Sequence, residues 1–161
     1  MINVICLSNM DTNKHAPMAW SRITNYIIVG TNLCCTRHAN KLYDLGTTAD
    51  IDLQEQHDHD HAAAKVPNSL WLPTPDLTAP SIDQLYSGTA LLAQLVDRQQ
   101  TTYVHCRLGH GRAPTLVAAY FIRTGFSPTE AVDKVTAKRP EIHLESSQLK
   151  QLDKFAKLVQ P

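Results

Sequence analysis

The feature that most constrains the fold of this chain is a short β-branched run that leads, through two glycines, into a long apolar stretch. Thr101–His105 has the composition of a buried strand, and the residues from Arg112 to Gly125 have the apolar character of a buried helix. Gly109 and Gly111 lie between them and permit backbone turns that a Cβ atom would hinder. A strand that passes through such a loop into a helix is typical of an α/β sheet.

Strand-like and helix-like patterns alternate along the first two thirds of the chain, and only helical patterns follow. Ile23–Val29 indicates a strand or a short hairpin, and Thr48–Leu53 alternates apolar with polar residues in the period of a strand. Ser127 and Glu130 form a capping box that opens a further helix. The remaining patterns predict a strand at Ser69–Leu72 and helices at Arg37–Leu45, Ser81–Arg98 and Ser146–Val159. This order predicts an α/β sheet with a helical C-terminal half.

The length of 161 residues predicts one domain, because two ordinary domains need a longer chain. Residues 1–20 are largely polar and aperiodic, so we expect a loosely ordered lead-in there and a single domain over residues 21–161. The chain carries 15 Lys and Arg against 15 Asp and Glu, so its net charge is zero. This balance argues against a nucleic-acid partner and against a polybasic membrane-surface protein.

The apolar and cysteine patterns indicate where the protein acts. The sequence has neither the long apolar stretch of a membrane span nor the basic start of a signal peptide, so we expect no stable membrane insertion. Its four cysteines are irregularly spaced and do not resemble a secreted disulfide framework. We therefore expect a cytoplasmic protein in a reducing compartment, and we expect it to act as a monomer.

The residues between the predicted strand and helix have the chemistry of a phosphate site. A strand–loop–helix junction turns backbone amides into one concavity, and the helix N-terminus adds partial positive charge. Arg112 can bind two oxygens of the same phosphate. The same positive environment favours the thiolate of Cys106, which is the nucleophilic form. The predicted phosphate-binding loop around Cys106 comprises His105, Arg107, Leu108, Gly109, His110 and Gly111.

Cleavage of a phosphate ester also needs an acid for the leaving oxygen. Asp76 is the candidate, because it lies on a loop stiffened by Pro73 and Pro75 directly after a predicted strand. In the expected reaction, Cys106 attacks phosphorus to give a phosphocysteine, and water then hydrolyses it with Asp76 as base. Arg112 and the loop amides supply the charge stabilisation, so we expect no metal and no other cofactor.

The pattern His105–Cys106–x–x–Gly109–x–Gly111–Arg112 resembles the signature loop of the cysteine-based protein tyrosine phosphatase superfamily. The small size of the chain and the upstream Pro75–Asp76 acid are similar to its atypical dual-specificity branch. The resemblance covers most of the chain and includes, outside the loop, the stretches Ile23–Gly30, Leu45–Thr48 and Lys138–Pro140, and Gln148.

This resemblance implies a dual-specificity phosphatase-like fold, in which helices flank a central mixed, mostly parallel sheet, and a phosphatase domain over residues 21–161. It implies hydrolysis of phosphate monoesters on a phosphorylated protein, or on a polyphosphorylated small molecule such as a phosphoinositide or an inositol phosphate. It further implies that His105 supports the geometry of Cys106 and the loop, and that Gln148 helps to place the water. An ordinary position on a helix surface is the alternative for Gln148.

One position departs from the family pattern. The family usually has Ser or Thr after the loop arginine, where the hydroxyl eases breakdown of the phosphoenzyme, whereas this chain has Ala113. Slow turnover would make the protein a phosphate-binding module, or pseudo-phosphatase, and this is one alternative. A sulfurtransferase or an arsenate reductase with the same Cys-x5-Arg loop is another, although sulfur transfer leaves Asp76 unexplained.

Several reactive residues have plainer interpretations. We expect Cys34 and Cys35, near His38, to pack in the fold, with disulfide protection of Cys106 as the alternative. His57–His61 alternates His with Asp in a way that fixes no metal geometry, so a solvated loop is expected.

Two loop side chains should lie at the rim of the phosphate cradle. Arg107 and His110 either face solvent or contact a second anionic group of the substrate.

Overall fold

The computed structural model describes residues 17–56 and 66–160, and within them five strands form one sheet in the order β1-β2-β5-β3-β4. β1 pairs with β2 in antiparallel fashion, and the other pairings are parallel. The predicted mixed, mostly parallel sheet is therefore confirmed. The strands are β1 (Trp20–Arg22), β2 (Ile27–Gly30), β3 (Thr47–Asp52), β4 (Asn68–Trp71) and β5 (Thr101–His105).

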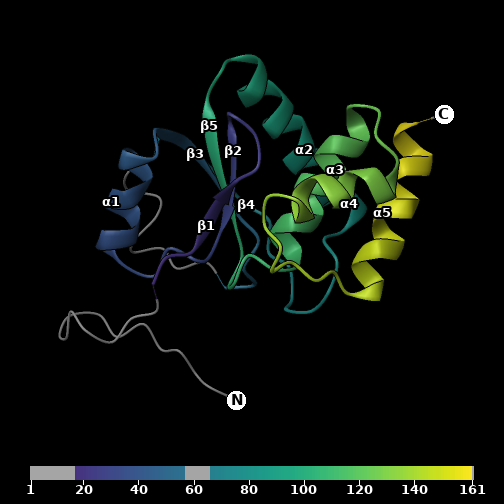
Figure 1. Cartoon of the computed structure of the whole chain (residues 1–161), viewed down its shortest axis with the longest axis horizontal. Helices are drawn as coiled ribbons and strands as arrows, with labels where there is room; N and C mark the ends of the chain where they lie inside the picture. The colour runs from purple at the N-terminus through teal and green to yellow at the C-terminus, as the bar shows by residue number, and fades with distance from the viewer. Residues whose placement is uncertain (1–16, 57–65, 161) are drawn as a thin grey trace.

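Helices cover both faces of the sheet, with α1 on one side and α2 to α5 on the other (Figure 1). Strand residues alternate between the two sides: Ile27 and Val29 join the core under α2 to α5, whereas Ile28 joins the smaller core under α1. α3 lies at the centre of the larger core, and its residues from Arg112 to Ile122 are all buried. The helices are α1 (Thr36–Asp44), α2 (Ile82–Asp97), α3 (Arg112–Arg123), α4 (Pro128–Thr136) and α5 (Ser146–Val159).

The helix boundaries follow the capping signals of the sequence. The Ser127 hydroxyl accepts from the Glu130 amide at 3.3 Å, and the Glu130 carboxylate accepts from the Ser127 amide at 2.9 Å, so the predicted capping box is confirmed. Ser81 and Gln84 form a second capping box at the start of α2. Among the described residues, no helix combines the length and the apolar character that a membrane span needs.

The N-terminal hairpin differs from its prediction in position. The β-branched run at Ile23–Val29 is not one strand, because the Thr24 hydroxyl accepts from the amides of Tyr26 and Ile27 and closes a turn. The edge strand β1 precedes this turn, and Trp20 pairs with Gly30. Regular structure thus begins at Trp20, inside the lead-in expected over residues 1–20, of which 1–16 lie outside the described residues. The predicted loop at His57–His61 lies outside them as well.

Candidate active site

The predicted phosphate loop lies at the carboxyl edge of the sheet, between β5 and α3. β5 is flanked by β2 and β3, which run parallel to it, so the ends of all three strands meet at the same edge. Leu53 follows β3 and donates its amide to His105 O at 2.8 Å. The segment 73–81, which carries Asp76, follows the parallel strand β4 and opens onto the same edge. The topology therefore brings Cys106 and Asp76 to one pocket, as the sequence predicted.

The backbone carbonyls of residues 107–111 are bonded on the outer side of the loop. In a planar trans peptide the N–H points opposite to the C=O, so the amides of residues 108–112 face the inner side. Inward amides in succession form an anion-binding concavity, with the N-terminus of α3 behind it. The outward bonds are Arg107 O from Asn32 N (3.2 Å), Leu108 O and Gly109 O from the Arg139 guanidinium (3.0 and 2.9 Å), His110 O from His143 N (3.1 Å), and Gly111 O from the Thr115 amide and hydroxyl (2.9 and 2.8 Å).

Arg139 fixes the outer side of this loop. Its side chain is 1% exposed, and besides the two loop carbonyls it donates to Ser21 Oγ at 3.3 Å. Gly109 lies beside it with φ of 69°, and a Cβ there would approach Gly30 O to 2.6 Å. Only glycine fits this position, because the loop packs directly on the end of β2. Sequence reasoning found Arg139 only through a resemblance of its surroundings and did not assign it this role.

A buried charged cluster lies at the end of β5 and β3, next to Cys106. His105 Nε2 is 3.0 Å from Asp50 Oδ1, and His105 Nδ1 is 3.7 Å from Asp52 Oδ1, with all three side chains at most 2% exposed. Burial lowers the pKa of His105, but the charges of Asp50, Asp52 and Cys106 and the bonding to Asp50 outweigh it and raise that pKa to about 9. His105 is therefore an imidazolium at neutral pH, and it places a fixed positive charge beside the Cys106 position.

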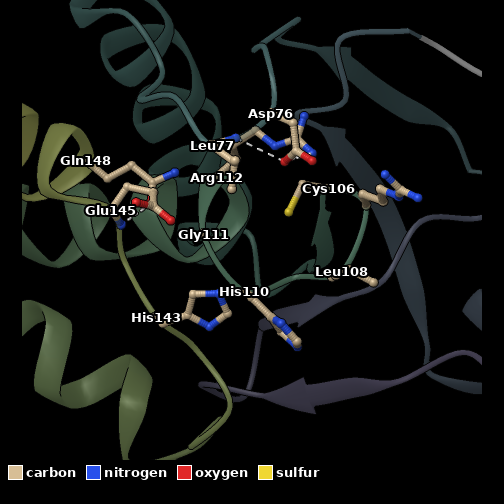
Figure 2. Close-up of a pocket in the computed structure, with 11 residues that line it drawn as sticks. Asp76, Leu77, Cys106, Leu108, His110, Gly111, Arg112, His143, Glu145 and Gln148 are labelled. Atoms are coloured by element: carbon tan, nitrogen blue, oxygen red, sulfur yellow. Dashed lines mark hydrogen bonds and ion pairs between the residues drawn. The ribbon is translucent and has the colours of Figure 1, made fainter. Parts of the chain in front are cut away.

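Arg112 and Asp76 face each other above Cys106 (Figure 2). Arg112 is buried and donates from Nη1 to Thr74 O at 2.8 Å, while its Nη2 is 2.9 Å from Asp76 Oδ1. The Asp76 side chain is 57% exposed. One end of the guanidinium is thus held by the Asp76 loop itself, and the other end is paired with a carboxylate that solvent reaches.

Gln148 is not the helix-surface residue that its sequence position favoured. It is 1% exposed, accepts from the Glu145 amide at 2.9 Å and donates to Thr78 O at 2.8 Å. A Cβ on Gly111 would lie 3.0 Å from its Nε2, so the amide of Gln148 packs against the loop. This contact joins the start of α5 to the segment that carries Asp76, and water placement by Gln148 stays a prediction.

The rim of the pocket combines basic and apolar side chains. Arg107 and Leu108 are exposed, and His110 is half-buried with its ring 5.4 Å from that of His143. Burial and the nearby charges of Arg139 and His143 lower the pKa of His110, so its imidazole is neutral at pH 7. Leu77 completes this rim beside Asp76.

The residue after Arg112 offers no hydroxyl to the pocket. Ala113 is fully buried, and the Thr115 hydroxyl donates to Gly111 O at 2.8 Å, one turn back along α3. The Thr115 hydroxyl therefore donates its proton to a backbone carbonyl and not to the sulfur of Cys106.

Within the described residues, one group of His, Cys, Asp or Glu side chains has metal-ligand spacing. That group is Cys34, Cys35 and His38, and it does not line the pocket.

Comparison with known proteins relates this chain to a family of phosphatase domains. A family model described as "Swiss Army Knife protein, DSP-PTPase phosphatase domain" matches residues 19–156. The chain is 30% identical over 153 residues to the phosphatidylglycerophosphate phosphatase PTPMT2 of Arabidopsis thaliana, and 38% identical over 92 residues to phosphatidylglycerophosphatase and protein-tyrosine phosphatase 1 of Homo sapiens. These alignments cover 88% and 56% of this chain but only 64% and 46% of the two relatives.

Solved structures show the same fold. The crystal structures of PTPMT1 and of PTPMT1 in complex with PI(5)P superpose with TM-scores of 0.77 and 0.78, each at 27% identity. They cover 88% and 87% of this chain and 96% of each of those chains. The chain therefore belongs to the DSP-PTPase phosphatase domain family, within the cysteine-based protein tyrosine phosphatase superfamily, as its loop motif predicted.

Proposed function

We propose that this protein hydrolyses phosphate monoesters through a phosphocysteine formed on Cys106. The observation that carries the proposal is the convergence of three groups on one pocket: the Cys106 sulfur, the Arg112 guanidinium, and the Asp76 carboxyl 2.9 Å from that guanidinium. The concavity of inward amides supplies the remaining donors for a tetrahedral phosphoryl group.

In the first step the Cys106 thiolate attacks phosphorus, and the S–P bond forms as the bond from phosphorus to the ester oxygen breaks. Asp76 donates its proton to that leaving oxygen. Arg112 exchanges its contact with Asp76 for two phosphoryl oxygens, which frees the carboxyl for proton transfer. In the second step water attacks phosphorus, Asp76 accepts its proton, and the S–P bond breaks to release phosphate.

We further propose that the preferred substrate is a phosphorylated lipid headgroup rather than a phosphotyrosine peptide. One curated relative is named as a phosphatidylglycerophosphate phosphatase, and a second as both a phosphatidylglycerophosphatase and a protein-tyrosine phosphatase. One solved structure of PTPMT1 holds PI(5)P. The rim of this chain also suits a lipid, because Leu77 and Leu108 are 67% and 55% exposed beside the pocket. Arg107, His110 and His143 are positioned to contact further anionic groups of a headgroup.

The test is a phosphate-release assay with three substrates: phosphatidylglycerophosphate in mixed micelles, phosphoinositides in the same micelles, and a phosphotyrosine peptide. We expect kcat/KM to be at least about tenfold higher for a lipid than for the peptide, a difference of about 1.4 kcal/mol. Higher activity on the peptide would refute the lipid preference without touching the phosphocysteine chemistry.

Cys106→Ser tests the chemistry itself. We expect turnover of every substrate to fall by at least about 10⁴-fold, because no other group can form the covalent intermediate. Cys6→Ser is the matched control and should keep its activity. A Cys106→Ser variant with full activity would rule out the mechanism.

A phosphate-binding module with poor turnover is the second candidate, and the engaged Thr115 hydroxyl next to Ala113 favours it. Rapid mixing with an aryl phosphate distinguishes the two candidates. A burst of one product equivalent followed by negligible release would identify the module, whereas continued linear release would identify the enzyme. In Ala113→Ser we expect faster release after the burst, because the new hydroxyl can donate to the departing sulfur.

A further inference from the structure

Three potential metal ligands converge where the chain leaves the sheet for α1. The sulfurs of Cys34 and Cys35 and a ring nitrogen of His38 all lie within 4.8 Å of one another. Cys34 Sγ is 3.6 Å from His38 Nδ1. Cys34 and His38 are buried, and Cys35 is half-buried.

The spacing of these atoms is that of a tetrahedral zinc site. Bonds of about 2.3 Å to sulfur and about 2.0–2.1 Å to nitrogen, at tetrahedral angles, separate sulfur from nitrogen by about 3.5 Å and two sulfurs by about 3.8 Å. The Cys34–His38 separation already matches the first value. The other two pairs lie within 4.8 Å. To reach these values the two sulfurs need to close by at most about 1 Å, and Cys35 and His38 by at most about 1.3 Å.

The charges of the three groups suit a divalent cation. Two thiolates and a neutral imidazole offset the charge of such an ion, which removes the cost of burying unpaired charge. Sulfur and imidazole donors select zinc over magnesium and calcium, which prefer oxygen.

We propose that Cys34, Cys35 and His38 bind a zinc ion, with a fourth ligand from outside this group of described residues. The two thiols release their protons to solvent as the Zn–S bonds form. The ion would fix the start of α1 to the segment that follows β2. In that segment Thr31 O accepts from the Tyr103 hydroxyl at 2.8 Å, and Asn32 donates to Arg107 O in the phosphate loop.

The test uses the full chain with Cys6→Ser and Cys106→Ser, which leaves Cys34 and Cys35 as the remaining thiols. Titration with Co²⁺ should produce a sulfur-to-cobalt charge-transfer band and the visible bands of tetrahedral cobalt, saturating at one equivalent. One equivalent of Zn²⁺ should then bleach both. Sites made of histidine and carboxylate alone give no sulfur band, so His57–His61 cannot imitate this signal. Absence of the band would overturn the proposal.

Single substitutions then assign the ligands. Loss of a group that merely orients a ligand costs 10–100-fold in metal affinity, so loss of a direct ligand should cost more than about 100-fold. We expect this loss for Cys34→Ser, Cys35→Ser and His38→Gln, and no change for the matched control His143→Gln.

Cys35→Ser keeps the test decisive if the buried variants do not fold, since Cys35 is half-buried. Its circular dichroism without metal should match that of the parent, while its charge-transfer band should be about half as intense because one thiolate remains. Unchanged affinity and band intensity in Cys35→Ser would overturn the proposal.

Discussion

Two segments form the candidate active site, and they are held in different ways. The phosphate loop, residues 106–112, is fixed through its own carbonyls by Arg139 and Asn32, which do not line the pocket, and by the backbone amide of His143 at the pocket rim. The segment 73–81 is fixed by side chains from other helices, and its Asp76 is paired with Arg112 inside the pocket.

The difference separates what the substrate can change from what it cannot. In the proposed reaction, a bound phosphate competes with Asp76 for Arg112, so we expect the position of the segment 73–81 to depend on the substrate. The phosphate does not compete for the loop carbonyls, which point away from the pocket. We therefore expect the phosphate loop to be preorganised, as electrostatic catalysis requires.

Asp76→Asn, in the segment 73–81, should have the largest effect. We expect kcat for an alkyl phosphate to fall about 10²–10⁴-fold, because no acid protonates the leaving oxygen. Stability should change by less than about 1 kcal/mol, since the pair with Arg112 is more than half exposed at the carboxylate. Steady-state kinetics and thermal melting measure the two quantities.

The leaving group provides a control for this variant. A nitrophenolate departs without a proton, so the loss of activity should be smaller for an aryl ester than for an alkyl ester. Asp83→Asn, an exposed carboxylate in the first turn of α2, should leave kcat unchanged. An equal loss for both esters would show that Asp76 does not act as the acid.

Arg139→Met should disrupt the phosphate loop. The carbonyls of Leu108 and Gly109 lose charged donors, and we expect a loss of about 3 kcal/mol in the free energy of unfolding. Activity should fall together with stability, because the loop amides lose their inward orientation. Urea unfolding and kinetics on the same sample measure both, with the exposed Arg123→Met as control. Full activity in Arg139→Met would show that the loop holds its shape by itself.

Asp50→Asn alters the buried charged cluster around His105, next to the phosphate loop. The pKa of His105 is raised from 6.5 to about 9 in the folded protein, so its stabilising contribution is complete below about pH 6.5 and is lost as the pH rises through about 9. We expect the melting temperature of the parent to fall over this range. In Asp50→Asn the fall should be smaller, because the carboxylate that favours the His105 imidazolium is gone.

The control for the pH experiment is Asp44→Asn, at the exposed end of α1, which should retain the pH profile of the parent. Identical pH profiles in Asp50→Asn and the parent would exclude the cluster as their cause.

Gln148→Met should give the smallest effect. It removes the hydrogen bonds to Thr78 O and from the Glu145 amide. Only the first supports the segment that carries Asp76, with a net value of about 1 kcal/mol, so we expect kcat/KM to fall about fivefold. Gln151→Met is the matched variant, since it removes an equivalent bond to Pro80 O farther along the same segment. If Gln151→Met reduces kcat/KM by as much, the effect belongs to the stiffness of the segment and not to the position of Gln148.

Much of this architecture was predictable because the relevant signals are local. The turn at Gly109, the capping box at Ser127 and the proline-stiffened segment before Asp76 each depend on a few neighbouring residues, and each was found where the sequence predicted it. The convergence of Cys106 and Asp76 needed one further step, which was the rule that parallel strands end at the same edge.

The residues that sequence reasoning missed are buried polar groups whose partners lie far along the chain. Asp50 and Asp52 occupy the polar positions of an alternating strand, which predicts solvent exposure, but α1 covers that face and His105 lies between them. Arg139 contacts Ser21 across 118 positions. No local pattern distinguishes such residues from surface charges, because their partners are set by the tertiary fold.

The contact between Arg139 and Ser21 also has a consequence for biosynthesis. Arg139, which follows α4, binds the carbonyls of the phosphate loop and also the hairpin near the start of the chain. A nascent chain that has emerged only as far as α3 carries Cys106 but not Arg139. With the proposed function, we therefore expect the nucleophile to become active only late in synthesis.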